Sequence, residues 1–400
     1  MKIAIIGGGA SGMMAALTAS ENKEHSVVLF ERQARMGKKL LATGNGRCNL
    51  SNRKMDISHY HGAAPEFCSY ALERFGTDET LDFFRGLGLL TVTEESGRVY
   101  PYSDSANSVA DVLRLSLEQR DNVKIMTGCE VTALHRKNRR FELGYGEEIF
   151  TADRVIVCAG GVAGGKLGGV DMGYKLLASF GHKRTKLYPA LVQLRTDTTF
   201  VRSLKGVRCE AQVFCGDEMR RGEVQFTDYG LSGPVIFELS RSISVCGEDR
   251  VLQLDFLPDL DKNELLRLLQ NRQAAMPALK AEDLLTGMVH NRLGRTVLRA
   301  CGHSLERECG SFNLGELKQL VWKLKNFEIK AFGTMGMDQA QVTAGGMNTA
   351  EFDPKTMESR LCPGLYAAGE VLDIDGDCGG YNLQWAWASG HLAGELKGKV

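Results

Sequence analysis

The feature that most restricts the fold of this 400-residue chain is a glycine pattern at its start. Residues 2–6 form a short apolar run rich in β-branched side chains, which is typical of a buried parallel strand. Gly7, Gly9 and Gly12 follow with the spacing G-x-G-x-x-G, and helix-forming residues come next. In such a unit the first glycine permits a tight turn, the second lets the backbone approach a pyrophosphate, and the third lets the helix pack on the strand. The pattern predicts a Rossmann-type βαβ unit that binds phosphate at the helix amino terminus.

An acidic residue completes this unit. A second expected strand, Ser26–Phe30, ends at Glu31, which lies 19 positions after Gly12. The carboxylate that binds a ribose hydroxyl in dinucleotide-binding units stands about 20 positions beyond the glycines. A glycine triplet alone is a weak signal, because ordinary turns also use glycine. The ordered series of strand, turn, helix, strand and acid predicts a dinucleotide that is bound through its ADP half.

The segment after Glu31 favours FAD over NAD. An NAD-binding domain usually continues into another βαβ unit, whereas here a long loop follows, residues 32–52, with several glycines, few acids and the basic pair Lys38 and Lys39. Such a loop can run back along an extended cofactor and place small residues beside a flat ring. Near the carboxyl end, residues 364–394 repeat the order of strand, glycine loop and helix, and that helix can stabilise negative charge on a reduced flavin. The residues predicted to bind FAD are Gly7, Gly9, Ala10, Ser11, Gly12, Glu31, Arg32, Lys38, Lys39, Leu40, Thr43, Gly44, Asn45, Gly46, Asn49, Glu130, Val131, Ala159, Gly160, Gly161, Gly369, Glu370, Asp375, Gly379, Gly380, Tyr381, Asn382 and Leu383.

Three residues are candidates for the chemistry beside the ring: Arg47, Cys48 and Tyr381. Arg47 and a helix dipole would lower the pKa of Cys48 and allow a thiolate, but without a partner cysteine the sequence favours a small packed side chain. Tyr381 could donate a proton to a substrate, or its ring could simply pack. The sequence has no Ser-His-Asp set, paired-carboxylate motif or H-E-x-x-H motif.

Composition excludes several classes of partner. The 49 basic and 49 acidic residues balance, so we expect no nucleic acid and no anionic membrane as a partner. The chain has neither a signal peptide nor an apolar run of about 20 residues, and its eleven scattered cysteines lack a Cys-x-x-Cys pair, so we expect a cytoplasmic protein with reduced thiols. No metal is expected, because nothing nearby completes a ligand set with His59 and His61, and the acidic run Asp373–Asp377 lacks EF-hand spacing.

Several longer blocks carry a resemblance to a known family. They include "GKKLLATGNGRCNLSN", "GEVQFTDYGLSGPVIFELSR" and "GLYAAGEVLDIDGDCGGYNLQWAWASG". With them the chain resembles the BaiN-type, aminoacetone-oxidase-like family of FAD-dependent oxidoreductases, within the glutathione-reductase-like two-dinucleotide flavoproteins. The resemblance implies FAD and an inserted domain, and the family's reactions include unsaturated-steroid reduction and amine oxidation. Residues 162–174 lack the Ser-Tyr-Pro turn common in that family, so the substrate cavity here can differ.

The order of patterns along the chain predicts an α/β fold. We expect a discontinuous Rossmann-like FAD-binding domain, residues 1–187 and 328–400, that carries an inserted β-barrel-like subdomain and an inserted helical subdomain. The β-rich subdomain spans residues 188–258, where alternating runs that include "GPVIFELS" indicate strands, and the helical subdomain spans residues 259–327.

These features predict an FAD-dependent oxidoreductase that transfers a hydride between bound flavin and a small organic or steroid-like substrate. Two alternatives remain: an RNA-modifying flavoprotein, and a non-catalytic flavin-binding redox protein. No second G-x-G-x-x-G precedes a helix, so we expect no dedicated nicotinamide domain and at most transient docking of NAD(P)H as electron donor. The oligomeric state is not predicted.

Overall fold

The computed structural model describes residues 1–247 and 250–398. These residues form two compact units, each with its own hydrophobic core. The first unit combines Met1–Tyr188 with Gln341–Val400, and the second unit is the continuous segment Pro189–Ala340.

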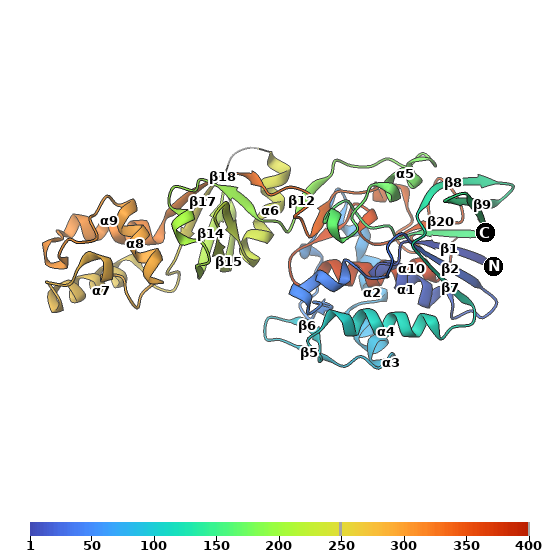
Figure 1. Ribbon diagram of the computed structural model, residues 1–400, viewed down its shortest axis with the longest axis horizontal. Helices are drawn as coiled ribbons and strands as arrows, with labels where there is room; N and C mark the ends of the chain where they lie inside the picture. The colour runs from blue at the N-terminus through green and yellow to red at the C-terminus, as the bar shows by residue number, and fades with distance from the viewer. Residues whose placement is uncertain (248–249, 399–400) are drawn as a thin grey trace. The chain divides into compact units, whose positions relative to one another are not determined.

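A parallel five-stranded sheet forms the centre of the first unit, and four of its strands are labelled side by side in Figure 1. Its strands, in spatial order, are β20 (Leu365–Ala367), β11 (Arg154–Val157), β1 (Lys2–Ile6), β2 (Ser26–Glu31) and β7 (Val123–Thr127). The strands β1, β2 and β11 are almost entirely buried, which explains their near-continuous apolar sequences. This confirms the Rossmann-type α/β architecture that the sequence predicts.

Two helices pack closely in this unit, α1 (Ala10–Ala19) and α10 (Tyr381–Gly394). Gly12 lets α1 approach β1, because a Cβ atom at this position would overlap the carbonyl oxygen of Gly7. Gly390 has the same role between the helices, where a Cβ atom would overlap the carbonyl oxygen of Ser11. The two ends of the chain therefore meet at the start of α1.

Smaller elements surround this sheet. The antiparallel strands β8 (Val131–Lys137), β9 (Arg140–Tyr145) and β10 (Glu148–Ala152) form one additional sheet. A second is formed by β3 (Ser51–Asn52), β6 (Arg98–Pro101) and β5 (Thr91–Thr93). The remaining helices of the unit are α2 (Ser69–Arg74), α3 (Thr77–Gly86), α4 (Ala106–Glu118) and α5 (Met172–Ala178).

The second unit is a closed six-stranded barrel with helices. Its strands, in barrel order, are β13 (Leu194–Thr196), β16 (Gly230–Ser232), β15 (Glu218–Phe226), β14 (Arg208–Cys215), β17 (Arg250–Asp255) and β18 (Phe327–Thr334). Within this unit, α7 (Lys262–Ala275), α8 (Asn291–Ala300) and α9 (Leu314–Lys325) lie together beyond the barrel (Figure 1). No helix among the described residues combines the length and the apolar composition that a membrane span requires.

Two details of the insert differ from the sequence prediction. The run "GPVIFELS" belongs to a helix, α6 (Pro234–Cys246), and not to a strand. Val235, Ile236, Leu239 and Ile243 are its buried apolar residues, and their spacing matches a helix face. The first unit resumes at Gln341 rather than at residue 328, because β18 pairs with β13 and β17 and closes the barrel.

Candidate functional site

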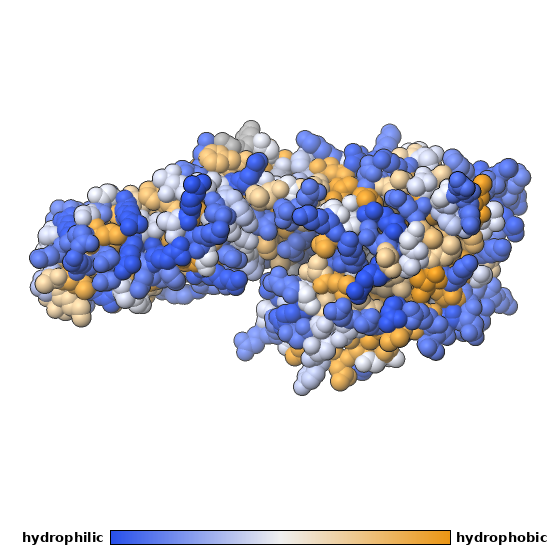
Figure 2. All heavy atoms as spheres, viewed as in Figure 1, coloured by the Kyte–Doolittle hydropathy of each residue, from blue (hydrophilic) through white to orange (hydrophobic). Residues whose placement is uncertain are grey.

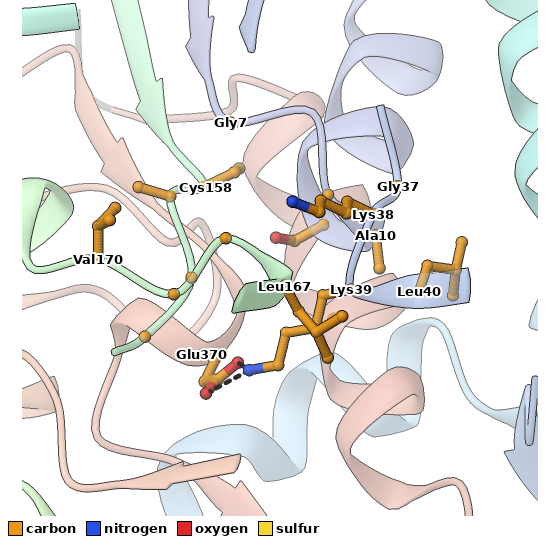
Figure 3. A pocket seen from close by; sticks show the side chains of 18 of the residues that line it. Gly7, Ala10, Gly37, Lys38, Lys39, Leu40, Cys158, Leu167, Val170 and Glu370 are labelled. Carbon is orange, nitrogen blue, oxygen red and sulfur yellow. Dashed lines mark hydrogen bonds and ion pairs between the residues drawn. The ribbon is translucent and has the colours of Figure 1, made fainter. Parts of the chain in front are cut away.

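A cavity of the first unit lies where β1, β2 and β11 end and α1 begins. Ligands of open α/β sheets bind at this edge. The cavity walls come from segments distant in sequence, including the loop after β2, residues 167–172 and the first residues of α10 (Figure 3). The predicted cofactor residues that line it are Gly7, Gly9, Ala10, Ser11, Glu31, Arg32, Lys38, Lys39, Leu40, Thr43, Glu130, Val131, Ala159, Gly160, Gly161, Glu370, Asn382 and Leu383.

The remaining predicted residues lie outside this lining. They are Gly12, Gly44, Asn45, Gly46, Arg47, Cys48, Asn49, Gly369, Asp375, Gly379, Gly380 and Tyr381. Several of them support the wall from behind. A Cβ atom at Gly369 would lie 2.6 Å from the hydroxyl oxygen of Ser11, and Gly380 is the residue that precedes α10. Gly12 and Cys48 are buried, whereas Asn45 and Gly46 are exposed.

The start of α1 is suited to an anionic group. Gly9 is the N-cap residue, no side chain caps the helix, and its first turn contains no acid, so its backbone N–H groups are available to a ligand. No atom lies within 4 Å of the position that a Cβ would take at Gly9 or at Gly160. The ammonium group of Lys38 lines the same cavity, and its hydrogen-bond partner is the side-chain oxygen of Gln33 at 3.2 Å. These groups fit a pyrophosphate.

The carboxylate of Glu31 is held in place by the backbone. Its Oε2 atom accepts a hydrogen bond from the Gly8 N–H at 2.7 Å, and its Oε1 atom accepts one from the Gln33 N–H at 2.7 Å. Each carboxylate oxygen can accept a further bond, so Glu31 can still bind ribose hydroxyl groups. This arrangement fits the adenosine part of FAD.

The two neighbouring lysines of the loop have different partners. The ammonium group of Lys39 lies 2.6 and 2.9 Å from the carboxylate oxygens of Glu370. Dashed lines mark this ion pair in Figure 3. The Oε1 atom of Glu370 also accepts a hydrogen bond from the Thr343 N–H at 2.9 Å. The Lys39 and Glu370 side chains are 30% and 21% exposed, so this ion pair is partly shielded from water. Lys39 is therefore neutralised within the protein, whereas Lys38 is not.

The structure brings none of the three predicted catalytic side chains into the cavity lining. The Arg47 guanidinium pairs with Glu94 at 3.1 Å and with Asp104, and it lies 4.0 Å from the centre of the Tyr100 ring. The prediction of a lowered Cys48 pKa is wrong, because complete burial raises the pKa of this thiol to about 12.

Tyr381 is likewise buried in packing. Its hydroxyl group donates a hydrogen bond to the Lys54 carbonyl at 3.3 Å, and its ring stacks on His59 with 4.2 Å between ring centres. The side chain thus supports the start of α10 from the side away from the cavity lining.

The sequence prediction missed one wall of the cavity. Leu167, Gly168, Gly169 and Val170 line it, and the Arg32 guanidinium donates a hydrogen bond to the Gly168 carbonyl at 3.1 Å. The four glycines between residues 164 and 169 were the available signal, because such a segment can approach a ligand closely. The other lining residues that the prediction omitted are Ile6, Phe30, Gln33, Gly37, Cys129, Cys158, Met172, Gln341, Val342, Ile374, Trp385 and Ala386.

Comparison with known proteins identifies the family. The model of the family described as HI0933-like protein Rossmann domain matches residues 1–396. The chain is 41% identical over 407 residues to the 3-dehydro-bile acid delta(4,6)-reductase of Clostridium scindens, with 98% of each chain covered. It is 29% identical over 389 residues to the ribosomal RNA dihydrouridine synthase of Escherichia coli K12, covering 96% of this chain and 95% of that protein.

A solved structure shares the fold. The 3-ketosteroid delta1-dehydrogenase of Sterolibacterium denitrificans matches with a TM-score of 0.52 and 13% identity, and 98% of each chain is covered. The family match extends over nearly the whole chain, and the cavity of the first unit fits the polar groups of FAD. The chain therefore belongs to the HI0933-like family and is an FAD-dependent oxidoreductase.

Proposed function

We propose that this enzyme reduces a carbon–carbon double bond conjugated to a carbonyl group in a small, steroid-like substrate. The observation that carries the proposal is the 41% identity, over 98% of both chains, to a 3-dehydro-bile acid delta(4,6)-reductase. That name describes a ketone conjugated with carbon–carbon double bonds. Such a bond accepts a hydride at one carbon and a proton at its neighbour, and FAD supplies the hydride when it is bound.

In this proposal FAD lies along the cavity of the first unit. The backbone N–H groups at the start of α1 and Lys38 hold the pyrophosphate, and Glu31 holds the adenosine ribose. The flavin would then be held near Ile374, Asn382 and Leu383, where the start of α10 would stabilise negative charge. If NAD(P)H is the electron donor, it would dock only transiently, because the sequence has no second G-x-G-x-x-G turn before a helix to hold its phosphates.

A second candidate is reduction of uracil in ribosomal RNA. Two relatives with 29% and 28% identity are ribosomal RNA dihydrouridine synthases, and the uracil double bond is also conjugated to a carbonyl group. The charge of the second unit favours the small substrate, because residues 189–340 contain twenty basic and twenty acidic residues. Proteins that bind RNA backbones usually present an excess of basic groups.

One experiment separates the two candidates. The enzyme is reduced under anaerobic conditions and mixed either with a 3-oxo-4,6-diene steroid or with ribosomal RNA transcribed in vitro. The masses of the products are then measured by mass spectrometry. We expect the steroid to gain two mass units in a single turnover, while the RNA stays unchanged. Free reduced FAD is the control. A gain of two mass units in uridine alone would assign the second function instead.

A further inference from the structure

Two histidines that have no partner in the sequence pattern share one carboxylate in the structure. The Nδ1 atom of His59 lies 3.0 Å from the Oδ2 atom of Asp377, and the Nε2 atom of His61 lies 2.7 Å from its Oδ1 atom. The Asp377 side chain is 16% exposed, whereas the imidazoles are 35% and 29% exposed. The imidazoles can therefore exchange protons with water while the carboxylate between them is shielded.

This cluster is fixed to the start of α10. The strand β4 (Tyr60–His61) pairs with β21 (Asp375–Gly376), and the Asp377 N–H donates a hydrogen bond to the His59 carbonyl at 2.9 Å. The His59 ring stacks on the ring of Tyr381, the first residue of α10. The imidazoles and the helix terminus are thus one packed assembly.

The same helix terminus faces the cofactor cavity. Asn382 and Leu383 line the cavity, and the Asn382 amide exchanges hydrogen bonds of 2.9 and 2.6 Å with the backbone of Gly376, next to Asp377. No side chain caps α10, and no acid lies in its first turn. A ligand at this terminus therefore experiences both the partial positive charge of the helix end and the charge of the neighbouring cluster.

We propose that His59, His61 and Asp377 make the reduction potential of FAD bound at the start of α10 depend on pH. With both imidazoles neutral, the cluster carries the negative charge of Asp377 and opposes the positive end of the helix. Protonation of one imidazole cancels that charge. Reduction by hydride adds negative charge to the flavin, so protonation of the cluster stabilises the reduced cofactor. This inference rests on the flavin placement described under the proposed function.

Several titratable and charged groups surround the two imidazoles and their shared carboxylate. Burial alone would raise the pKa of Asp377, but the hydrogen bonds from His61 and His59 hold it below its ordinary value. The other titratable or charged groups nearby are Asp56, Tyr60, Arg98, Asp373, Asp375 and Cys378. Imidazole is the side chain whose ordinary charge change falls between pH 5 and 8. Among the described residues, no group of histidine, cysteine and acidic side chains is arranged to hold a metal ion.

The test is the reduction potential of the flavin in the holoenzyme, measured against redox dyes between pH 5 and 8 without substrate. Asp377→Asn removes the carboxylate, and the double variant His59→Gln/His61→Gln removes the imidazoles. His135→Gln is the control, because it removes an exposed imidazole on β8 that belongs to no part of this cluster. Because this measurement uses no substrate, its result can be interpreted whatever the outcome of the steroid assay.

We expect the wild-type potential to rise more steeply on acidification than that of the double variant, and the His135→Gln control to match wild type. Asp377→Asn keeps both imidazoles but removes the negative charge, so its potential should exceed that of wild type at pH 8. Charges near a helix terminus have modest effects on binding, and from their size we expect the ratio of affinities for reduced and oxidised FAD to change two- to fivefold more in wild type than in the double variant. Fivefold is about 20 mV for a two-electron couple. If Asp377→Asn loses its flavin, the double variant decides. Identical slopes for wild type and the double variant would overturn the proposal.

Discussion

Gly9 gives the sharpest test of the cofactor placement, because it separates binding from folding. Its backbone angles are φ −80° and ψ −169°, which any residue can adopt, and no atom lies within 4 Å of a Cβ built there. Gly9→Ala should therefore change the free energy of unfolding of the flavin-free protein by less than about 0.5 kcal/mol. The new methyl group would project into the cavity, where the pyrophosphate must approach the backbone.

The expected loss is in cofactor affinity. Displacing the phosphate from one backbone N–H removes a charge-assisted hydrogen bond worth about 1.5–3 kcal/mol, which is roughly a 10- to 150-fold weaker Kd for FAD. Titration of the flavin-free protein with FAD, followed by quenching of flavin fluorescence, measures this Kd. Urea unfolding of the same preparations measures stability.

Two other glycines serve as matched comparisons. Gly86 ends α3, outside the cavity lining, and a Cβ there also meets no atom within 4 Å, so Gly86→Ala should alter neither quantity. Gly12→Ala should destabilise the fold by several kcal/mol, because its Cβ would overlap the Gly7 carbonyl. Unchanged FAD affinity in Gly9→Ala would show that this turn does not hold the pyrophosphate.

Three further predictions address other residues. Glu31→Ala should weaken FAD binding by about 10- to 100-fold through loss of a charged acceptor for the ribose, measured by the same titration; equal affinity would make Glu31 a purely structural acid. Cys48→Ala should leave the rate of flavin reduction unchanged, because burial raises the pKa of the thiol to about 12; a large loss of rate would restore its catalytic role. Burial lowers the pKa of His182, although Glu351 opposes this shift. Stability from His182 should thus be complete above the ordinary imidazole pKa and be lost as pH falls. His182→Gln should flatten that part of a urea-unfolding series across pH; an unaltered profile would contradict the argument.

The cofactor half of the site was predictable because its determinants are local. Gly7, Gly9, Gly12 and Glu31 lie within one βαβ unit, where a short stretch of chain fixes both the turn and the position of the acid. The structure places Gly7, Gly9 and Glu31 in the cavity lining and Gly12 in the helix packing beneath it. The spacing of these four residues in the sequence is therefore enough to predict their positions, because the rest of the fold does not change them.

The misread helix α6 shows where local pattern fails. The run "VIFELS" is rich in residues that also suit strands, so alternation and helical periodicity compete over such a short length. Pro234 at the first helical turn was the signal for a helix start, and Gly233, with φ of +105°, makes the turn before it. The buried positions Val235, Leu239 and Ile243 become a helix face only when the run is read as far as Cys246.

The partners of the candidate side chains could not be predicted for a different reason, which is their distance along the sequence. Arg47 pairs with Asp104, 57 positions later, and Lys39 pairs with Glu370, 331 positions later. His59 acquires Asp377 across 318 positions. No spacing rule reaches so far, and each partner changes what the side chain can do: the Lys39 ammonium is paired with the Glu370 carboxylate, and the two imidazoles lie against one shared carboxylate.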